Sequence, residues 1–398
     1  MNPQSIRKID YWLGRPICFL LTFFRASASA AIAKPKKIVF LKFIEQGATV
    51  LACSAIKRAT EIVGKENVYF CVFENNRPIL DILGVIPQKN IITLSDKSLF
   101  DFILDSFSAL RKIKRENIDT VIDMEFFSRA SAIFSYLSGA RIRAGLHRFT
   151  SELPYRGDLM THRLQYNPYL HTSDFYRSLV ESTLQDPSEV PMMKVPKTGS
   201  APLLPSFIPS DTEKKAVLEK INVPFGAEKK KTVILNPNAS DLLPLRKWES
   251  EKFIALGKRI LSENENARLI ISGAPSEQKE AEEICRQIGS EKAVSFAGKT
   301  TLRELLTLYT VSDILVTNDS GPGHFSSLTG ITTIILFGPE TPKLFGPLSP
   351  NAHVIWKDLA CSPCVNVFNH RFSPCNNNLC MKTITVEEVY AAVKKYLN

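Results

Sequence analysis

The chain has 398 residues, of which 44% are hydrophobic and 23% are charged. This length predicts two domains rather than one core, and the composition is that of a globular protein, which excludes a largely disordered chain. The formal net charge is +10, and residues 1–37 hold seven Lys or Arg against one acid, Asp10. A basic segment that carries apolar residues favours anionic lipid head groups over nucleic acid as a partner.

The N-terminal leader, residues 1–34, contains the stretch RKIDYWLGRPICFLLTFFRASAS. Its longest uncharged run, PICFLLTFF, has nine residues, far fewer than the roughly 20 that span a bilayer. Three interpretations stay open: a helix on the membrane surface, a helix packed onto the following domain, and a cleaved signal peptide. We favour the surface helix and expect no transmembrane helix elsewhere.

From residue 36 onwards, β-branched and aromatic runs alternate with segments of helical periodicity. In the first half we expect strands at 36–44, 67–73, 91–94 and 118–125, and helices at 45–63, 78–84, 99–117 and 126–140. The pattern loosens over 146–230, with one helix expected at 172–184. It then resumes with strands at 230–236, 267–273, 293–298, 313–319 and 332–338, and helices at 250–264, 276–289, 301–312 and 385–398.

This alternation predicts an α/β protein with doubly wound parallel sheets. The break in the pattern predicts two Rossmann-like domains that face each other across a cleft. We expect them at 35–205 and 231–398, joined by a linker at 206–230.

The stretch NDSGPGHFSS, residues 318–327, follows an apolar strand. In open α/β sheets, ligands bind at the carboxyl ends of strands, where helix N-termini also point. Gly321 and Gly323 lack Cβ atoms, so that backbone amides there could approach an anion such as a phosphate. The alternative is a tight turn between strand and helix, capped by Ser320.

Two further turns are expected at the same sheet edge. Asn238, Ser240, Arg246 and Lys247 follow the strand at 230–236, and either cation could neutralise a diphosphate. Glu277 follows the next strand, where a carboxylate could accept both hydroxyls of a ribose. Each could instead be a solvated surface charge, but together the three turns predict a nucleotide diphosphate site.

Residues 316–348, VTNDSGPGHFSSLTGITTIILFGPETPKLFGPL, resemble the C-terminal signature of glycosyltransferase family 9, the lipopolysaccharide heptosyltransferases. RKWESEKF is similar to the donor-phosphate element of that family, and GAPSEQKEA to its ribose-binding turn. The resemblance implies a GT-B fold and an inverting enzyme that moves a sugar from a nucleotide diphosphate, ADP-heptose by default, to an envelope glycolipid. The domain at 35–205 would bind the acceptor and that at 231–398 the donor.

The resemblance also implies roles for individual residues. Asp319 would contact the donor sugar, Lys247 would stabilise the departing phosphate, and Glu277 would hold the ribose. The start of the helix that cradles the phosphate would consist of Ser320, Gly321, Pro322, Gly323 and His324. Such a site needs no divalent metal or other cofactor, and the sequence has no Asp-x-Asp motif.

The first turn departs from the family, because Gly47-Ala48 stands where heptosyltransferases usually have Gly-Asp. That aspartate is thought to deprotonate the acceptor, and alanine cannot. Glu45 in the same turn and Glu125 at the end of a strand are the candidate replacements. We favour Glu125, since strand ends are held more rigidly than turns; the alternative is an ion pair with a basic residue.

Basic residues follow the next strand-like segment, GARIRAGLHRF. An acceptor with phosphates or acidic sugars would be drawn to such a cluster, and the alternative is a solvated loop. The predicted acceptor-binding residues are Arg129, Arg143, His147 and Arg148.

Four cysteines crowd into the loop 361–380 as C-x2-C-x10-C-x4-C. The first pair has zinc-knuckle spacing and the second does not, so a structural zinc ion, a local disulfide and free thiols all stay open. The four are Cys361, Cys364, Cys375 and Cys380.

The sequence thus predicts a glycosyltransferase that acts on a lipid-linked glycan, on the cytoplasmic side and peripherally attached to the inner face of the cytoplasmic membrane. Two alternatives remain: a GT-B-like sugar-nucleotide epimerase, and a catalytically silent relative that only binds nucleotide or glycolipid, which Ala48 keeps open.

Overall fold

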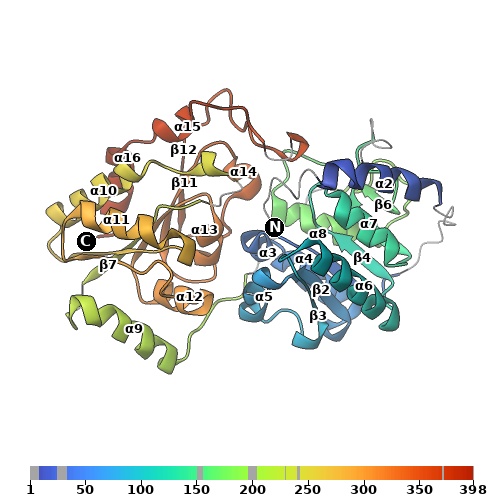
Figure 1. Ribbon diagram of the computed structural model, residues 1–398, viewed down its shortest axis with the longest axis horizontal. Helices are drawn as coiled ribbons and strands as arrows, with labels where there is room; N and C mark the ends of the chain where they lie inside the picture. Colours follow the sequence, from blue (N-terminus) through green and yellow to red (C-terminus); the bar gives the residue numbers. More distant parts are fainter. Residues whose placement is uncertain are drawn as a thin grey trace. The chain divides into compact units, whose positions relative to one another are not determined.

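The computed structural model describes residues 9–24, 34–149, 156–195, 204–228, 230–239, 243–369 and 372–397. The chain divides into two compact units, residues 1–203 and 204–398. Each unit contains a six-stranded parallel sheet with helices packed on it (Figure 1). The predicted α/β class with two doubly wound sheets is therefore confirmed.

The first sheet has the strand order β3-β2-β1-β4-β5-β6. Its strands are β1 (Ile38–Leu41), β2 (Val68–Phe73), β3 (Ile91–Leu94), β4 (Thr120–Asp123), β5 (Ile142–Leu146) and β6 (His162–Leu164). The chain leaves the sheet in opposite directions from β1 and β4, which are paired in parallel. This switch point is where open α/β sheets leave a crevice at the carboxyl ends of their strands.

Helices cover both faces of this sheet, as the apolar composition of its strands requires. They are α3 (Gln46–Leu51), α4 (Cys53–Val63), α5 (Arg77–Leu83), α6 (Leu99–Arg115), α7 (Arg129–Leu137) and α8 (Thr172–Ser182). Side chains of α6 and α7, including Ile113 and Phe134, pack on Val39 and Val121 of the sheet.

Part of the leader forms α2 (Gly14–Phe23), which packs against α7. A Cβ at Gly14 would lie 2.9 Å from Cβ of Arg129, so only glycine permits this close approach. Asp10 accepts a hydrogen bond of 2.7 Å from the Arg129 guanidinium. Residues 9–24 are thus packed onto the first unit, and within the described ranges no helix is long and apolar enough to cross a membrane. The rest of the leader lies outside the described residues.

The second sheet has the order β12-β11-β10-β7-β8-β9. Its strands are β7 (Lys231–Asn236), β8 (Ala267–Ile271), β9 (Ala293–Ser295), β10 (Ile314–Asn318), β11 (Thr332–Phe337) and β12 (Ala352–Trp356). Here the switch point lies between the paired strands β7 and β10. The loops that follow these strands contain most of the predicted donor residues.

The helices of the second unit are α9 (Asp211–Phe225), α10 (Ser250–Glu263), α11 (Gln278–Ile288), α12 (Leu302–Thr310), α13 (Gly321–Ser326), α14 (Pro342–Phe345), α15 (Leu379–Lys382) and α16 (Val386–Lys394). The predicted linker, 206–230, is mostly the helix α9, which begins with a capping box at Ser210 and Glu213. Val217 and Ile221 of α9 are buried and the helix packs on α12, so this stretch is part of the second unit rather than a linker.

Candidate functional site

Asn318, the last residue of β10, hydrogen-bonds to two loop segments at the carboxyl edge of the second sheet. Its Nδ2 donates to the carbonyl of Pro237 at 2.9 Å, and its Oδ1 accepts from the amide of Trp248 at 3.0 Å. Trp248 is fully buried and its indole donates to the Ile384 carbonyl at 3.0 Å. The loop that carries Arg246 and Lys247 is therefore held against the end of β10.

A cation and two carboxyl groups meet beside this point. Nη1 of Arg246 lies 3.4 Å from Oδ2 of Asp319, and both side chains are largely buried. Burial, reinforced by the charge of Asp319 and opposed by the Arg246 guanidinium, raises the pKa of Glu340 to about 8. Burial also raises the pKa of Asp319, against the opposing effect of the Arg246 charge. Glu340, buried after β11, was not predicted, since nothing in FGPETP marks it.

Two buried donors at this edge have no hydrogen-bond partner within the described part of the chain: Nδ2 of Asn238 and Nε of Arg246. Buried polar groups in folded proteins are nearly always hydrogen-bonded, so unsatisfied donors at a strand-end cluster indicate a place for an acceptor. Phosphate and hydroxyl oxygens are acceptors of the required kind.

The two predicted cations of this turn, Arg246 and Lys247, have different ionic partners. Nζ of Lys247 lies 2.6 Å from Oε2 of Glu280 on α11, and Ser250 donates to the same carboxylate at 2.8 Å. Burial works against it, but these hydrogen bonds and the Lys247 charge lower the pKa of Glu280. It is Arg246 that the structure brings to Asp319, while Lys247 is engaged with α11.

Glu277 caps its own turn. Its Oε2 accepts from the amide of Ala274 at 2.6 Å, and a Cβ at Gly273 would lie 2.9 Å from the same oxygen and 3.2 Å from Nδ2 of Asn238. The ends of β7 and β8 are therefore close enough for Asn238 and Glu277 to share one small region.

The glycines at the start of α13 have a packing role. A Cβ at Gly321 would lie 3.1 Å from the ring of Phe325, and one at Gly323 would lie 3.1 Å from Cδ1 of Ile335. Neither glycine has a positive φ. Packing alone therefore accounts for these two glycines. Their role in letting backbone amides approach an anion stays a prediction.

The other predicted residues of this edge are placed as follows. Oγ of Ser320 donates to the Asn318 carbonyl at 3.1 Å instead of capping α13. Pro322 lies in the first turn of α13, and His324 is half-buried in the same helix. Ser240 lies outside the described residues.

At the switch point of the first sheet, a buried lysine joins the two candidate bases. Nζ of Lys42 lies 3.0 Å from Oε2 of Glu125 and 3.2 Å from Oε2 of Glu45. Oε1 of Glu125 also accepts from the amide of Phe43 at 2.7 Å. Glu125 is thus buried and held by several donors, whereas Glu45 is half-buried, with a backbone φ of 73°. A non-glycine residue in that conformation is strained and is often found at functional sites.

A second buried ion pair lies at the end of β4, at the same switch point. Asp123, the last residue of β4, is paired with Arg156 and accepts from Ser131 at 2.9 Å. Burial raises the pKa of Asp123, although the Arg156 charge and these hydrogen bonds oppose it. Asp123 Oδ1 accepts from the amide of Glu125 at 3.1 Å, which fixes the chain beyond β4.

Two predicted acceptor residues have structural contacts. The guanidinium of Arg129 is buried against Asp10 of the leader. Nε of Arg143 donates to the Leu159 carbonyl at 2.8 Å, and its Nη1 donates to the Ala140 carbonyl at 2.6 Å. The burial of Arg129 removes it from the surface, so it cannot contact an acceptor where it stands.

His147 and Arg148 are both half-buried and follow the end of β5. The ring of His147 lies edge-on to that of Phe149, with the ring centroids 4.8 Å apart. These two residues lie at the carboxyl edge of the first sheet and, unlike Arg129, are not fully buried.

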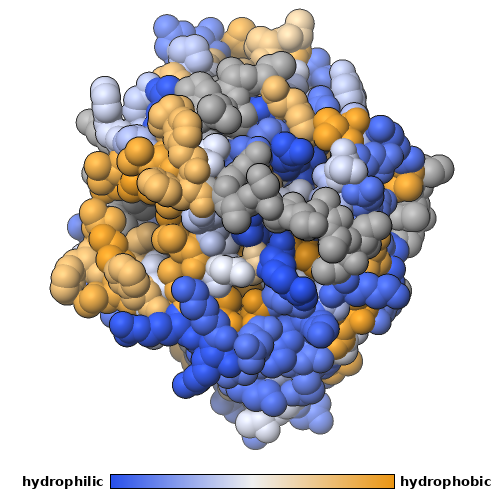
Figure 2. Space-filling model, turned by 90° about the vertical axis from the view of Figure 1, so that its right-hand side faces the viewer, coloured by the Kyte–Doolittle hydropathy of each residue, from blue (hydrophilic) through white to orange (hydrophobic). Residues whose placement is uncertain are grey.

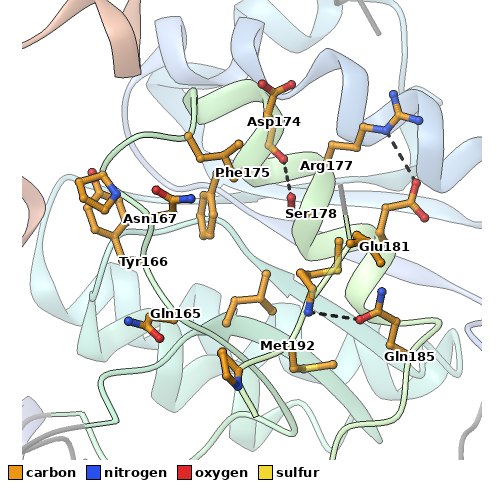
Figure 3. Close-up of a pocket in the computed structure, with 16 residues that line it drawn as sticks. Gln165, Tyr166, Asn167, Asp174, Phe175, Arg177, Ser178, Glu181, Gln185 and Met192 are labelled. Carbon is orange, nitrogen blue, oxygen red and sulfur yellow. Dashed lines mark hydrogen bonds and ion pairs between the residues drawn. The ribbon is translucent and has the colours of Figure 1, made fainter. Parts of the chain in front are cut away.

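The first unit also contains a cavity of about 840 Å³ between the segment after β6 and α8 (Figure 3). Aromatic, amide and thioether side chains line it, among them Tyr166, Asn167, Phe175, Gln185 and Met192. In Figure 3 the rings of Tyr166 and Phe175 stand on one side and Met192 on the other. None of the predicted acceptor residues lines this cavity.

No group of three or more His, Cys, Asp or Glu side chains is arranged to hold a metal ion in the ranges that the structure describes. Cys361 and Cys375 are exposed and Cys380 is buried, while Ser373 donates to Sγ of Cys364 at 3.2 Å. Burial raises the pKa of Cys380, and the charges of the other three cysteines add to this effect, so the four thiols lie near one another and the structural zinc ion stays a prediction.

Residues 106–371 match the model of glycosyltransferase family 9 (heptosyltransferase). Lipooligosaccharide heptosyltransferase 2 of Campylobacter jejuni subsp. jejuni serotype O:6 is 30% identical over 205 residues, which cover 48% of this chain and 61% of that protein. The chain thus matches about three fifths of the length of this relative.

Two solved structures have a similar fold. A glycosyl transferase of family 9 from Veillonella parvula gives a TM-score of 0.70 at 18% identity, covering 92% of this chain and 99% of that one. The ADP-heptose LPS heptosyltransferase II of Escherichia coli gives 0.67 at 17% identity, covering 91% and 98%. At such identities the likeness shows the fold, which is shared over almost the whole length. With the family match spanning well over half of the sequence, the chain belongs to glycosyltransferase family 9.

Proposed function

We propose that this protein is an inverting glycosyltransferase that moves a sugar, heptose in the first instance, from a nucleotide diphosphate to a lipopolysaccharide core or a related lipid-linked acceptor. The observation that carries the proposal is the cluster at the carboxyl edge of the second sheet. There Arg246, whose Nε is unsatisfied, pairs with the buried carboxyl group of Asp319, and the unsatisfied Nδ2 of Asn238 lies at the same sheet edge. The family membership and the names of the relatives, which are heptosyltransferases, support heptose as the sugar.

In this proposal the second unit binds the donor. Arg246 neutralises the diphosphate as the bond to the sugar breaks, Asp319 accepts from hydroxyls of the donor sugar, and Glu277 accepts from those of the ribose. Lys247 adds positive charge to the same region through its position next to Arg246. The start of α13, from Ser320 to His324, supplies amides near the phosphates.

The first unit provides the base. We assign that role to Glu45, because it is the more exposed of the two carboxylates that meet at Lys42, while Glu125 is held by Lys42 and by backbone amides. Glu45 takes the proton of the acceptor hydroxyl, and the acceptor oxygen bonds to the anomeric carbon. The bond from that carbon to the phosphate oxygen breaks with its electron pair, and attack from the opposite face inverts the configuration. The ion pair with Lys42, at 3.2 Å, holds Glu45 in position.

The acceptor is lipid-linked in this proposal, and the enzyme meets it at the cytoplasmic face of the inner membrane, with the leader as the attachment. His147 and Arg148 lie at the same sheet edge as Glu45 and would contact acidic groups of the acceptor glycan. The cavity at Tyr166 and Phe175 has a size typical of ligand sites and aromatic walls suited to sugar rings.

A transfer assay tests the proposal. The purified chain is incubated with ADP-heptose or with other nucleotide diphosphate sugars, with and without a heptose-free lipopolysaccharide inner core, and the products are analysed by mass spectrometry. We expect a glycosylated acceptor and an equal amount of nucleoside diphosphate. A changed sugar nucleotide formed without acceptor would establish the epimerase instead, and donor binding without turnover would establish the silent relative.

A further inference from the structure

Helix α6 presents an apolar face to solvent. Phe100 is 69% exposed and Phe107 is 57% exposed, and Ile103 and Leu104 between them are also exposed. These residues are spaced by three or four positions, so they lie on one side of the helix. The opposite side is already occupied, since it packs on the core of the first unit. The exposed side chains are therefore not needed for the fold of this unit.

The same face becomes basic in the second half of α6. Arg111, Lys114 and Arg115 are exposed, and the last turn of the helix holds several basic residues. A helix face that passes from aromatic and aliphatic side chains to Lys and Arg is typical of segments that lie at a membrane surface, where the apolar part enters the interface and the cations meet phosphates.

Two neighbouring helices continue the apolar surface. Helix α7 contacts both α2 and α6, and Figure 1 shows α2, α7 and α6 one after another on one side of the first unit. Trp12, two residues before α2, is 72% exposed and Phe23 at the end of α2 is 66% exposed, and Leu137 at the end of α7 is exposed as well. Figure 2 shows hydrophobic surface gathered along one edge of the visible face, with hydrophilic surface below it. Contiguous exposed apolar surface of this kind marks an interaction site.

We propose that the outer faces of α2, α7 and α6 form a single membrane-contact surface whose occupant is an anionic phospholipid bilayer. The three helices are successive neighbours, because α7 contacts both α2 and α6. The choice of a bilayer rests on charge complementarity, because the basic end of α6 borders the apolar surface and Arg141 follows α7 with its side chain 64% exposed.

This surface would attach the protein to the membrane at more places than the leader alone. The inference rests on the proposed function in one respect: a lipid-linked acceptor would be reached from this surface. Two attachment elements hold a protein at a membrane far more firmly than one, since the second binds at a high effective concentration.

Vesicle partitioning of the full chain tests the α6 contribution. Three variants are compared with wild type on vesicles of phosphatidylethanolamine and phosphatidylglycerol and on neutral phosphatidylcholine vesicles. They are the α6 variant Phe100→Ser/Leu104→Ser/Phe107→Ser, the α2 variant Trp12→Ser/Leu20→Ser/Phe23→Ser, which changes two residues of α2 and one just before it, and the control Ile208→Ser/Val223→Ser, which alters exposed apolar residues of the second unit. We expect the α6 and α2 variants each to lose at least about tenfold in partitioning onto anionic vesicles, and the control to match wild type.

A charge variant tests the basic end separately. Arg111→Gln/Lys114→Gln/Arg115→Gln should reduce binding to anionic vesicles several-fold and leave the weak binding to neutral vesicles unchanged. Partitioning of the α6 variant equal to that of wild type would overturn the proposal. So would an α6 variant that changes the protein from dimer to monomer in light scattering, because the surface would then join two copies of the chain.

The outcome is separable from that of the proposed function. Donor binding and transfer to a delipidated, soluble acceptor should be the same in the α6 variant and in wild type. If wild type transfers no sugar but the α6 variant still loses vesicle binding, the proposed function fails and the membrane surface stands. If transfer occurs and vesicle binding is unaffected, the reverse holds.

Discussion

Two adjacent residues of one turn in the second unit have different ionic partners. Arg246 and Lys247 are adjacent in sequence, yet the arginine reaches Asp319 and the lysine reaches Glu280. Arg246 also retains a buried Nε without a hydrogen-bond partner among the described residues, and guanidinium groups bind phosphates through two parallel hydrogen bonds. The proposed function therefore assigns to Arg246 the role that the sequence predicted for Lys247.

Replacement of Arg246 should therefore weaken donor binding more than replacement of Lys247. Loss of charge-assisted hydrogen bonds of about 1.5–3 kcal/mol predicts that Arg246→Gln raises the Kd for a nucleoside diphosphate by roughly ten- to a hundredfold. Isothermal titration calorimetry measures both variants, with Lys247→Gln as the matched control. An equal or larger effect of Lys247→Gln would restore the original assignment.

Glu45 and Glu125, the two carboxylates that pair with Lys42, should also have different roles, one in catalysis and the other in stability. Glu45→Gln should lower kcat by about a hundredfold or more, as expected for loss of a general base, with stability close to that of wild type. Glu125→Gln should lower the free energy of unfolding by about 2 kcal/mol or more, because it removes the charge that pairs with a buried lysine. Steady-state kinetics and urea unfolding of both variants decide the matter. Full activity of Glu45→Gln would exclude Glu45 as the base.

Glu340 makes stability depend on pH. A carboxyl group whose pKa is raised on folding contributes stability that is fully present below the ordinary pKa of about 4.5 and is lost as pH rises through about 8. Glu340→Gln should therefore raise the free energy of unfolding at pH 9 by roughly 2–4 kcal/mol relative to wild type, with little difference at pH 5. Urea unfolding at the two pH values measures this, and a variant that is no more stable at pH 9 would contradict the burial argument.

At the scale of elements, hydrophobic periodicity predicted most strands and helices. It failed for a helix flanked by prolines and for two strands at the edges of the sheets. The prolines around α9 suggested a linker, although its capping box and two buried side chains make it a regular helix of the second unit. The strands β6 and β12 were not expected, because one is only three residues long and the other is half-buried without a clear alternation. Short edge strands owe their conformation to the neighbour with which they pair.

The docking of α2 onto α7 is an element-scale prediction. A larger side chain at Gly14 would collide with Arg129, so Gly14→Val should lower the free energy of unfolding by about 1–3 kcal/mol and loosen the leader. Leu13→Ala, at an exposed position one residue earlier, should change stability by less than about 0.5 kcal/mol. Urea unfolding and limited proteolysis compare the two. Equal proteolysis of both variants and wild type would show that the helix is not held in this way.

For the whole molecule, both units repeat one plan, in which the strand order reverses at a switch point and polar loops gather at the carboxyl ends of the adjacent strands. In the first unit, this place holds Lys42 with Glu45 and Glu125; in the second, it holds Arg246 with Asp319. In the proposed function, the cluster of the first unit contains the base and that of the second unit binds the diphosphate.

A ligand should accordingly stabilise the second unit. Trp248 is fully buried there, next to the proposed donor loops, so its fluorescence follows the unfolding of that unit. A nucleoside diphosphate at a hundred times its Kd should raise the free energy of unfolding by about 2.7 kcal/mol. Thermal unfolding followed by fluorescence, with Arg246→Gln as a control that responds less, measures the effect. An unchanged midpoint would place the nucleotide elsewhere.

The amino-acid sequence by itself determined the α/β class, the division into two sheet domains, the family, and the loops in which donor residues are expected. These depend on local periodicity and on short motifs, which can be read without knowledge of the neighbours in space. Only the tertiary structure decided that Arg246 rather than Lys247 meets Asp319, that Arg129 is buried by Asp10, and that Glu340 is enclosed beside Asp319. Side-chain direction in a turn changes with a rotation of one residue, and burial depends on contacts between segments far apart in the chain, so neither is encoded in any local pattern.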